Sequence, residues 1–103
     1  MDYINEKTTA YVDIVFYDRN GLPATPNSIT YSTYCKTTGT PIKTNVSVAA
    51  ASQITIILDA LDSTIINTAN PSEVKVLTVK ASYNLNDALN SEYNWTVTNL
   101  VGV

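Results

Sequence analysis

The chain has 103 residues, of which 45% are hydrophobic, a size that suits one domain with one core. Only 15% of the residues are charged, the formal net charge is −3, and the six basic residues are spread out, which argues against nucleic acid as a direct partner. No stretch approaches the roughly 18 consecutive apolar residues of a membrane helix, and the single cysteine, Cys35, excludes an internal disulfide.

The N-terminal part of the chain predicts an arm followed by a strand. Residues 1–7 are polar and lack a period, which predicts a flexible N-terminal arm that either frays or orders on a neighbouring subunit. Residues 8–17 alternate cleanly, with Val12, Ile14 and Phe16 on one face. This alternation predicts a strand whose apolar face meets the core.

Turn residues separate the strands that follow. Asn20 and Gly21 supply the positive φ angles of a tight turn, after which the chain is irregular and rich in proline. Alternation then predicts strands at 28–36, 42–48 and 53–59. The middle strand of these three is mostly polar, which is typical of an edge strand or of a strand with one apolar face.

The last third of the chain predicts a corner and a hairpin. Apolar residues spaced at i, i+4 and i+5 predict one short helical corner near residues 61–68. Strands follow at 74–83 and 93–100, with Trp95 on the inner face of the second.

Short strands, turns about every ten residues, and the lack of a strand–helix–strand rhythm define the expected fold. We predict an all-β, immunoglobulin-like Greek-key sandwich of about six to seven antiparallel strands, formed by residues 8–103 as a single domain. A small barrel is the alternative.

Few residues offer chemistry. The chain has no histidine, so a catalytic triad is excluded, and with one cysteine a structural zinc site is excluded too. The nine acids are scattered and are interpreted as solvated surface groups, although a converging carboxylate pair stays open. Asp59 with Asp62 could ligate calcium, but helix capping accounts for them equally well. We expect no cofactor and no metal, and a buried, inert thiol at Cys35.

The aromatic residues are more suggestive of a binding surface. Seven tyrosines occur, and Tyr11, Tyr17 and Tyr34 fall on the outward registers of their strands. Exposed tyrosines are common at protein interfaces, so these three are the candidate interface residues. Packing against loops or along a sheet edge is an equally good interpretation.

Five segments in order carry a family resemblance. They are Leu-Pro-Ala-Thr-Pro (22–26), Ser-Ile-Thr-Tyr (28–31), Gln-Ile-Thr-Ile-Ile-Leu (53–58), Lys-Val-Leu-Thr-Val-Lys-Ala-Ser-Tyr (75–83) and Asn-Leu-Val-Gly-Val (99–103). Across nearly the whole chain, this pattern resembles the small immunoglobulin-like virion proteins of tailed bacteriophages.

The resemblance implies a structural role without enzyme activity. The expected protein is part of the virion and binds other virion proteins, namely the major capsid or connector protein, in multiple copies or as a homo-oligomer. It would attach to the capsid as a cement or decoration protein through its sheet faces and loops. The alternatives are a neck or tail accessory protein, or a module that recognises a carbohydrate or a host surface.

Overall fold

The computed structural model describes residues 2–18, 20–83 and 88–100 of the chain. Over these ranges the chain forms seven strands and no helix, so the all-β class predicted from the sequence is confirmed. Within the same ranges, therefore, no helix has the length and apolarity that crossing a membrane requires. The strands are β1 (Asp2–Asn5), β2 (Ala10–Val15), β3 (Ser28–Cys35), β4 (Thr40–Val48), β5 (Gln53–Leu58), β6 (Ser72–Ser82) and β7 (Ala88–Thr98).

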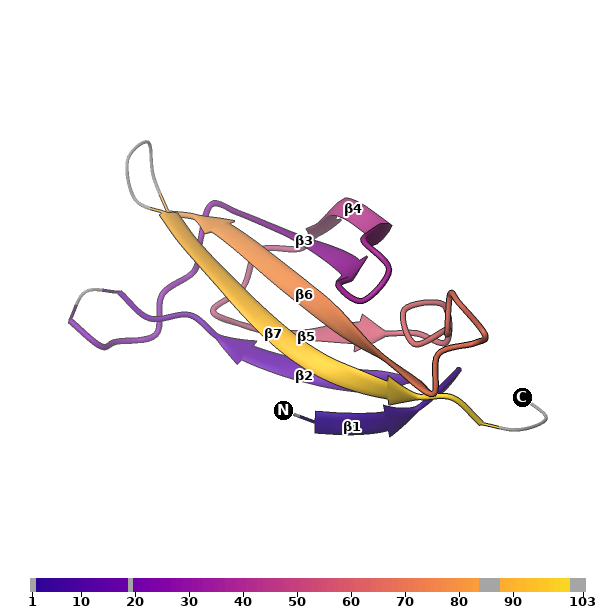
Figure 1. The fold of residues 1–103 in the computed structure, drawn as a ribbon. Coiled ribbons are helices and arrows are strands. Elements are labelled where there is room, and N and C mark those ends of the chain that lie inside the picture. The colour runs from indigo at the N-terminus through magenta and orange to yellow at the C-terminus, as the bar shows by residue number, and fades with distance from the viewer. Residues whose placement is uncertain (1, 19, 84–87, 101–103) are drawn as a thin grey trace.

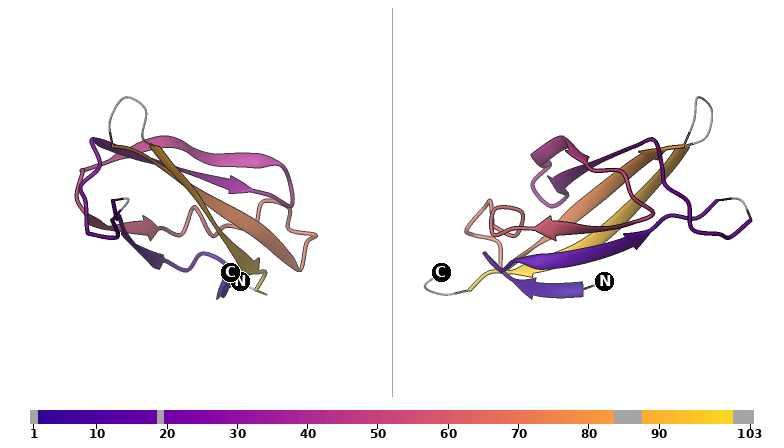
Figure 2. Two further views of the ribbon diagram at one scale, coloured as in Figure 1. Left: turned by 90° about the vertical axis from the view of Figure 1, so that its left-hand side faces the viewer. Right: turned by 180° about the vertical axis from the view of Figure 1, so that it is seen from behind.

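The strands form two sheets that pack around one apolar core, a sandwich-like arrangement (Figures 1 and 2). The large sheet has the order β1-β7-β6-β3-β4, and the small sheet contains only β2 and β5. Neighbouring strands run antiparallel except for β1, which pairs in parallel with β7. The small sheet therefore has two edges and covers only part of the large one.

The residues that the sequence alternation assigned to the inner faces of β5 and β7, and at the end of β2, are buried in the structure. Ile54, Ile56 and Leu58 on β5 are all buried, as expected for the strand predicted at 53–59. Phe16 and Trp95, assigned to the inner faces of their strands, are 0% and 1% exposed. They are the two largest fully buried side chains among the described residues, and they pack with aliphatic residues in the core between the sheets.

β4 forms one edge of the large sheet, as the polar pattern of 42–48 predicted. Its pairing with β3 shifts register twice, between Tyr31 and Thr33 and between Thr33 and Tyr34. Asn45 has a φ of 49°, a left-handed conformation that asparagine tolerates better than most residues. β4 is thus an irregular edge, and it also carries Pro41.

The helical corner predicted near residues 61–68 is not formed. The structure has turns and bends there, with single-turn hydrogen bonds such as Thr64 N–H to the Leu61 carbonyl at 3.3 Å. Carboxylates from outside the segment take the backbone donors: Glu73 accepts the N–H groups of Ile66 and Asn67. A backbone whose donors are used in this way does not continue into a helix.

The segment assigned to a flexible arm contains β1. Asp2–Asn5 pairs with β7 from Trp95 to Thr98, and Ile4 packs against the core. Glu6, which follows, is 6% exposed, and its carboxylate accepts the Leu100 N–H at 2.7 Å. The strand was missed because four residues with two polar side chains give no readable alternation, whereas the open edge of β7 supplies the partner.

Candidate functional site

The most concentrated polar chemistry lies at one end of the sandwich, in a cluster that we call the carboxylate cluster: Lys43, Asp59, Asp62, Glu73 and Lys75. Asp62, Glu73 and Lys75 have no exposed surface. The interpretation of all the acids as solvated surface groups is therefore wrong for Asp62 and Glu73, and also for Glu6.

Glu73 pairs with Lys75 in one half of this cluster. Its carboxylate accepts hydrogen bonds from the Ile66 and Asn67 backbone at 2.7 and 2.9 Å, from the Asn70 amide at 3.0 Å, and from Lys75 Nζ at 3.0 Å. Burial raises the pKa of the Glu73 carboxyl, but these hydrogen bonds outweigh it and lower the pKa from 4.5 to about 2. Glu73 therefore works as a fixed anion that holds the loop before β6.

Lys43 reaches from β4 to the other half of the cluster. Its Nζ lies 3.0 Å from Asp59 Oδ2 and 2.8 Å from Asp62 Oδ2. Burial lowers the pKa of Lys43, but the hydrogen bonds to Asp62 and Asp59 outweigh it and raise the pKa. The bond to Lys43 in turn lowers the pKa of the Asp59 carboxyl.

The pair considered as calcium ligands thus already has a cation. Asp59 Oδ1 also accepts the Leu61 N–H at 3.1 Å, which is a turn-capping role, and Asp62 Oδ1 accepts the Thr33 hydroxyl at 2.7 Å. In the part of the chain that the structure describes, no three His, Cys, Asp or Glu side chains gather as metal ligands. The Cys35 thiol is buried, as predicted, with Sγ 3.7 Å from Glu73 Oε1.

Sequence reasoning missed this cluster, although β6 carried a signal for it. Glu73 and Lys75 continue the inward register of Leu77 and Val79, so the alternation itself placed two charges on the core side. Opposite charges two apart on an inner face predict a buried ion pair. The geometry satisfies the pair with backbone and amide partners, which indicates a structural role rather than a poised acid or base.

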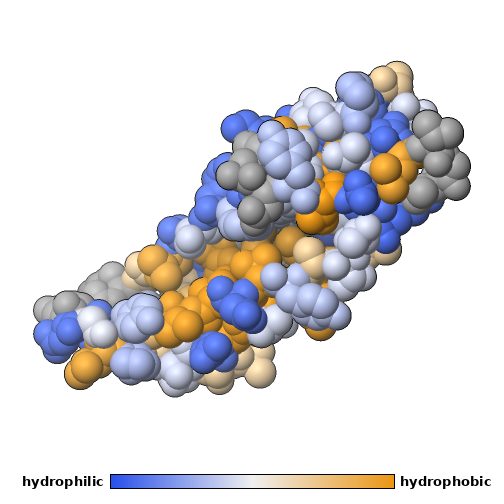
Figure 3. Space-filling view, turned by 90° about the horizontal axis from the view of Figure 1, so that it is seen from below, coloured by the Kyte–Doolittle hydropathy of each residue, from blue (hydrophilic) through white to orange (hydrophobic). Residues whose placement is uncertain are grey.

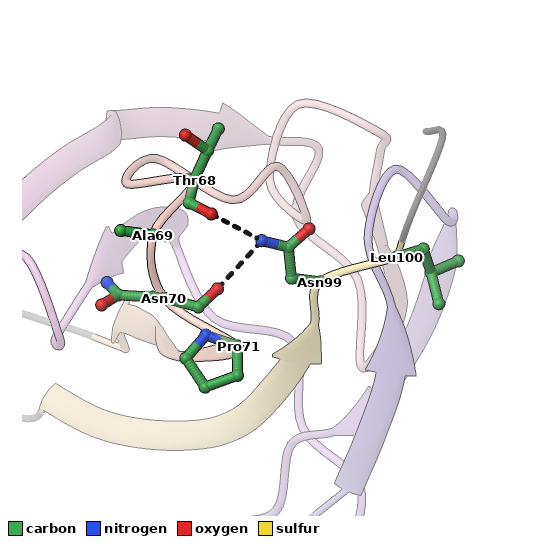
Figure 4. Close-up of a pocket in the computed structure, with 6 residues that line it drawn as sticks. All are labelled: Thr68, Ala69, Asn70, Pro71, Asn99 and Leu100. Atoms are coloured by element: carbon green, nitrogen blue, oxygen red, sulfur yellow. Dashed lines mark hydrogen bonds between the residues drawn. The ribbon is translucent and has the colours of Figure 1, made fainter.

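A shallow pocket of about 390 Å³ lies beside the same loop, lined by Thr68, Ala69, Asn70, Pro71, Asn99 and Leu100 (Figure 4). Asn99 Nδ2 donates to the Thr68 carbonyl at 3.1 Å and to the Asn70 carbonyl at 2.9 Å. These lining residues include no acid or base that could activate the Thr68 hydroxyl. The polar groups of the pocket tie β7 to the loop and leave no reactive set.

The three candidate interface tyrosines are all exposed, but they do not form one patch. Tyr11 is 68% exposed on the outer face of the small sheet, whereas Tyr34 is 41% exposed on the outer face of the large sheet. Tyr17 lies past the end of β2, where it forms an isolated bridge with Pro23. Two opposite faces of the molecule therefore carry the predicted residues.

The outer face of the small sheet carries more apolar surface than its tyrosine alone. Ile57, directly across from Tyr11, is 52% exposed, and Val15 is 40% exposed. Between them, the Thr55 hydroxyl donates to Asp13 at 2.6 Å. Ile57 was not among the candidate interface residues because only aromatic side chains were considered, although its register opposite the buried residues of β5 predicted its outward direction.

Comparison of this chain with protein-family models, with curated proteins and with solved structures found no match.

Proposed function

We propose that the chain is a non-enzymatic structural protein of a bacteriophage particle, where it binds the capsid as a cement or decoration protein. The observation that carries the proposal is the outer face of the small sheet, where Tyr11 and Ile57 expose apolar surface side by side and Val15 lies further along the same face, beyond Asp13 and Thr55. A large exposed apolar group on a sheet face is typical of a protein-binding surface. The five segments that resemble phage virion proteins supply the kind of partner.

The disposition of charge supports a binding role over an enzymatic one. The strongly perturbed carboxylate, Glu73, is held by internal donors, and both its partner Lys75 and the carboxylate of Asp62 are equally buried. A general acid or base needs access to substrate and a pKa near the working pH. A pKa of about 2 for Glu73 is far from that range.

The proposal includes an immunoglobulin-like Greek-key topology. In its support, the chain passes from β4 to β5 in the other sheet and returns to β6, which lies beside β3. Such exchanges between sheets are typical of Greek-key sandwiches.

A carbohydrate-binding module is the weaker candidate, because its usual platform would be an exposed tryptophan beside polar loops. Trp95 is 1% exposed and stacks with Tyr93 inside, at a centroid distance of 6.2 Å. A neck or tail accessory protein differs from a capsid protein only in its location and copy number.

Mass spectrometry of purified particles, with copy number, tests the proposal. We expect many copies per particle. A few copies would place the protein at the neck or tail, and absence from particles would overturn the proposal.

A pair of matched variants locates the surface. Tyr11→Ser with Ile57→Ser should abolish particle association without loss of folding, because both side chains are exposed. Tyr34→Ser, on the opposite face, is the control and should associate normally. Equal loss in both variants would argue against the small sheet as the contact face.

A further inference from the structure

We propose that the free edge of β2 accepts an additional strand from the partner: an extended protein segment in which apolar residues alternate with basic ones. The small sheet would then have three strands. This inference rests on the proposed function, because it requires a protein partner, and it adds how that partner is bound.

The first observation is the backbone of β2. Phe16 N–H donates to the Ser52 carbonyl at 2.8 Å, which fixes the phase of the antiparallel ladder between β2 and β5. Because hydrogen-bonded and non-bonded pairs alternate, the N–H and carbonyl groups of Tyr11, Asp13 and Val15 point away from β5. Within the described residues β2 has no other neighbouring strand. These groups are a ready template for strand addition.

The second observation is the unequal covering of the inner face. On β5, Ile54, Ile56 and Leu58 are 7%, 2% and 1% exposed. On β2, the matching inner residues, Val12 and Ile14 among them, are only partly buried although they pack against the same core. The core is thus closed under β5 and open along β2.

The surface of the molecule agrees with this opening. Seen from below, on the side where β1, β2 and β7 lie in Figure 1, apolar side chains gather around a hollow in the middle of the molecule (Figure 3). Tyr93 on β7 and Ile4 on β1 are also only partly buried against the core. A strand added to β2 would direct every second side chain over this apolar surface.

The other edges are less suitable for an added strand. β4 is irregular and carries Pro41 and Lys43, features that discourage edge pairing. β1 already covers β7 from Trp95 to Thr98, and residues 88–92 of β7 are exposed on both faces. A strand on the β5 edge would gain little, because the inner side chains of β5 are already covered. β2 contains no proline, lysine or register shift.

Charge selects the chemistry of the added strand. The described acids on the strands beside the hollow are Asp13 on β2 and Glu92 on β7, and these strands carry no lysine or arginine. Asp13 is exposed on the outer face of the small sheet, so a residue of the added strand directly opposite it would share that face. Basic residues at the outward positions would therefore be attracted, whereas acidic ones would be repelled.

The same argument disfavours a second copy of this chain as the occupant. A pairing of β2 with β2 of another copy brings two aspartates and no basic residue to the new seam. The net charge of −3 on each copy adds long-range repulsion.

The first experiment uses an octapeptide of alternating valine and lysine, with an alternating valine and glutamate octapeptide as the control. Amide hydrogen exchange of the full chain is followed by NMR with each peptide. With the lysine peptide, we expect the amides of Tyr11, Asp13 and Val15 to exchange roughly tenfold more slowly. The amides of Thr55 and Ile57, on the free edge of β5, should be unchanged. The glutamate peptide should bind more weakly.

Two matched variants test the mechanism. Val15→Pro removes an outward N–H of β2, and Gln53→Pro removes an outward N–H of β5, so both prolines are placed where the ladder tolerates them. Of the two, only Val15→Pro should weaken binding of the lysine peptide, with a roughly tenfold higher dissociation constant. Asp13→Lys should reverse the preference between the peptides: the affinity for the lysine peptide should fall roughly threefold and that for the glutamate peptide should rise roughly threefold. Circular dichroism confirms that each variant is folded.

The outcomes separate this inference from the proposed function. Protection on the β5 edge, equal binding of the two peptides, or no binding at millimolar peptide would overturn strand addition at β2. Protection of the β2 amides without peptide, growing with protein concentration, would assign the edge to a second copy and also overturn it. If Val15→Pro still associates normally with particles that contain the protein, the proposed function stands and this inference fails.

Discussion

At the scale of single residues, the unusual feature is a buried ion pair with several further donors. Lys75 Nζ donates to Glu73 Oε1 at 3.0 Å and to the Thr64 carbonyl at 2.8 Å, and neither charged side chain has exposed surface. Removing two charges from water costs several kcal/mol each, so such a pair persists only with many hydrogen bonds. Here they come from the loop that leads into β6, so the pair also fixes the shape of that loop.

The pKa of Glu73 gives a prediction for acid stability. Its folded value of about 2 lies below the ordinary 4.5, so its contribution is complete above pH 4.5 and is lost as the pH falls from about 4.5 towards 2. The size of this contribution is about 3 kcal/mol, at 1.36 kcal/mol per pKa unit. Urea unfolding at pH 7, 4 and 2.5 measures it.

The matched variants for this test are Glu73→Gln and Glu92→Gln. Glu73→Gln should be less stable at pH 7 and should lose much less stability between pH 4.5 and 2.5 than the unaltered chain. Glu92 is exposed, so Glu92→Gln should follow the unaltered chain. An identical acid profile for all three proteins would contradict the role of Glu73.

Trp95 gives a second prediction at this scale. Trp95→Ala should lower the free energy of unfolding by about 3 to 5 kcal/mol, because it removes a large buried side chain between the sheets. Trp95→Phe should cost clearly less, because Trp95 Nε1 has no hydrogen-bond partner among the described residues. Denaturant unfolding measures both, and a near-zero effect of the alanine variant would remove Trp95 from the core.

At the scale of elements, alternation predicted the strands that have one apolar face. Ile54, Ile56 and Leu58 define β5 without any tertiary information, because a half-buried strand needs this pattern. The corner at 61–68 could not be predicted in the same way. Its conformation depends on hydrogen bonds to carboxylates just outside the segment, above all Glu73, and helix propensity within the segment does not contain them.

β1 shows the same limit at the other end of the chain. Its four residues are ordered by a parallel ladder with β7 and by the packing of Ile4, both of which are long-range contacts. The proposed binding surface was likewise predictable only in part. The outward direction of the tyrosines was predicted, but the open edge of β2 follows from a strand order that no sequence pattern specified.

The pairing of β1 gives a prediction for the element. Removing residues 1–5 should lower the free energy of unfolding by roughly 2 kcal/mol, through the loss of ladder hydrogen bonds and of the half-buried Ile4. Thermal and urea unfolding of the shortened chain measure the loss. If residues 1–5 were a frayed arm, their removal would change neither the thermal nor the urea unfolding midpoint.

At the scale of the whole molecule, the two sheets share a core but no ladder. A two-stranded sheet alone is marginally stable in water at best. The small sheet therefore depends on the side chains that it buries against the large sheet, Phe16 and Ile56 among them.

We therefore expect both sheets to unfold in a single transition. Trp95 fluorescence reports on the large sheet, and the amide signals of Ile56 and Leu58 report on the small one. Their denaturation midpoints should coincide. An earlier loss of the β5 signals would mean that the small sheet is an independent, weaker unit.

The parallel pairing of β1 with β7 also determines how the molecule bears load. Tension applied at the two ends of the chain pulls β1 and β7 in opposite directions along their common axis, since both strands run the same way (Figure 1). The ladder from Asp2–Trp95 to Asn5–Thr98 is then sheared as a unit, so its hydrogen bonds must break together rather than one after another. A chain built in this way resists stretching between its ends far better than an antiparallel hairpin, which unzips from its open end towards the turn.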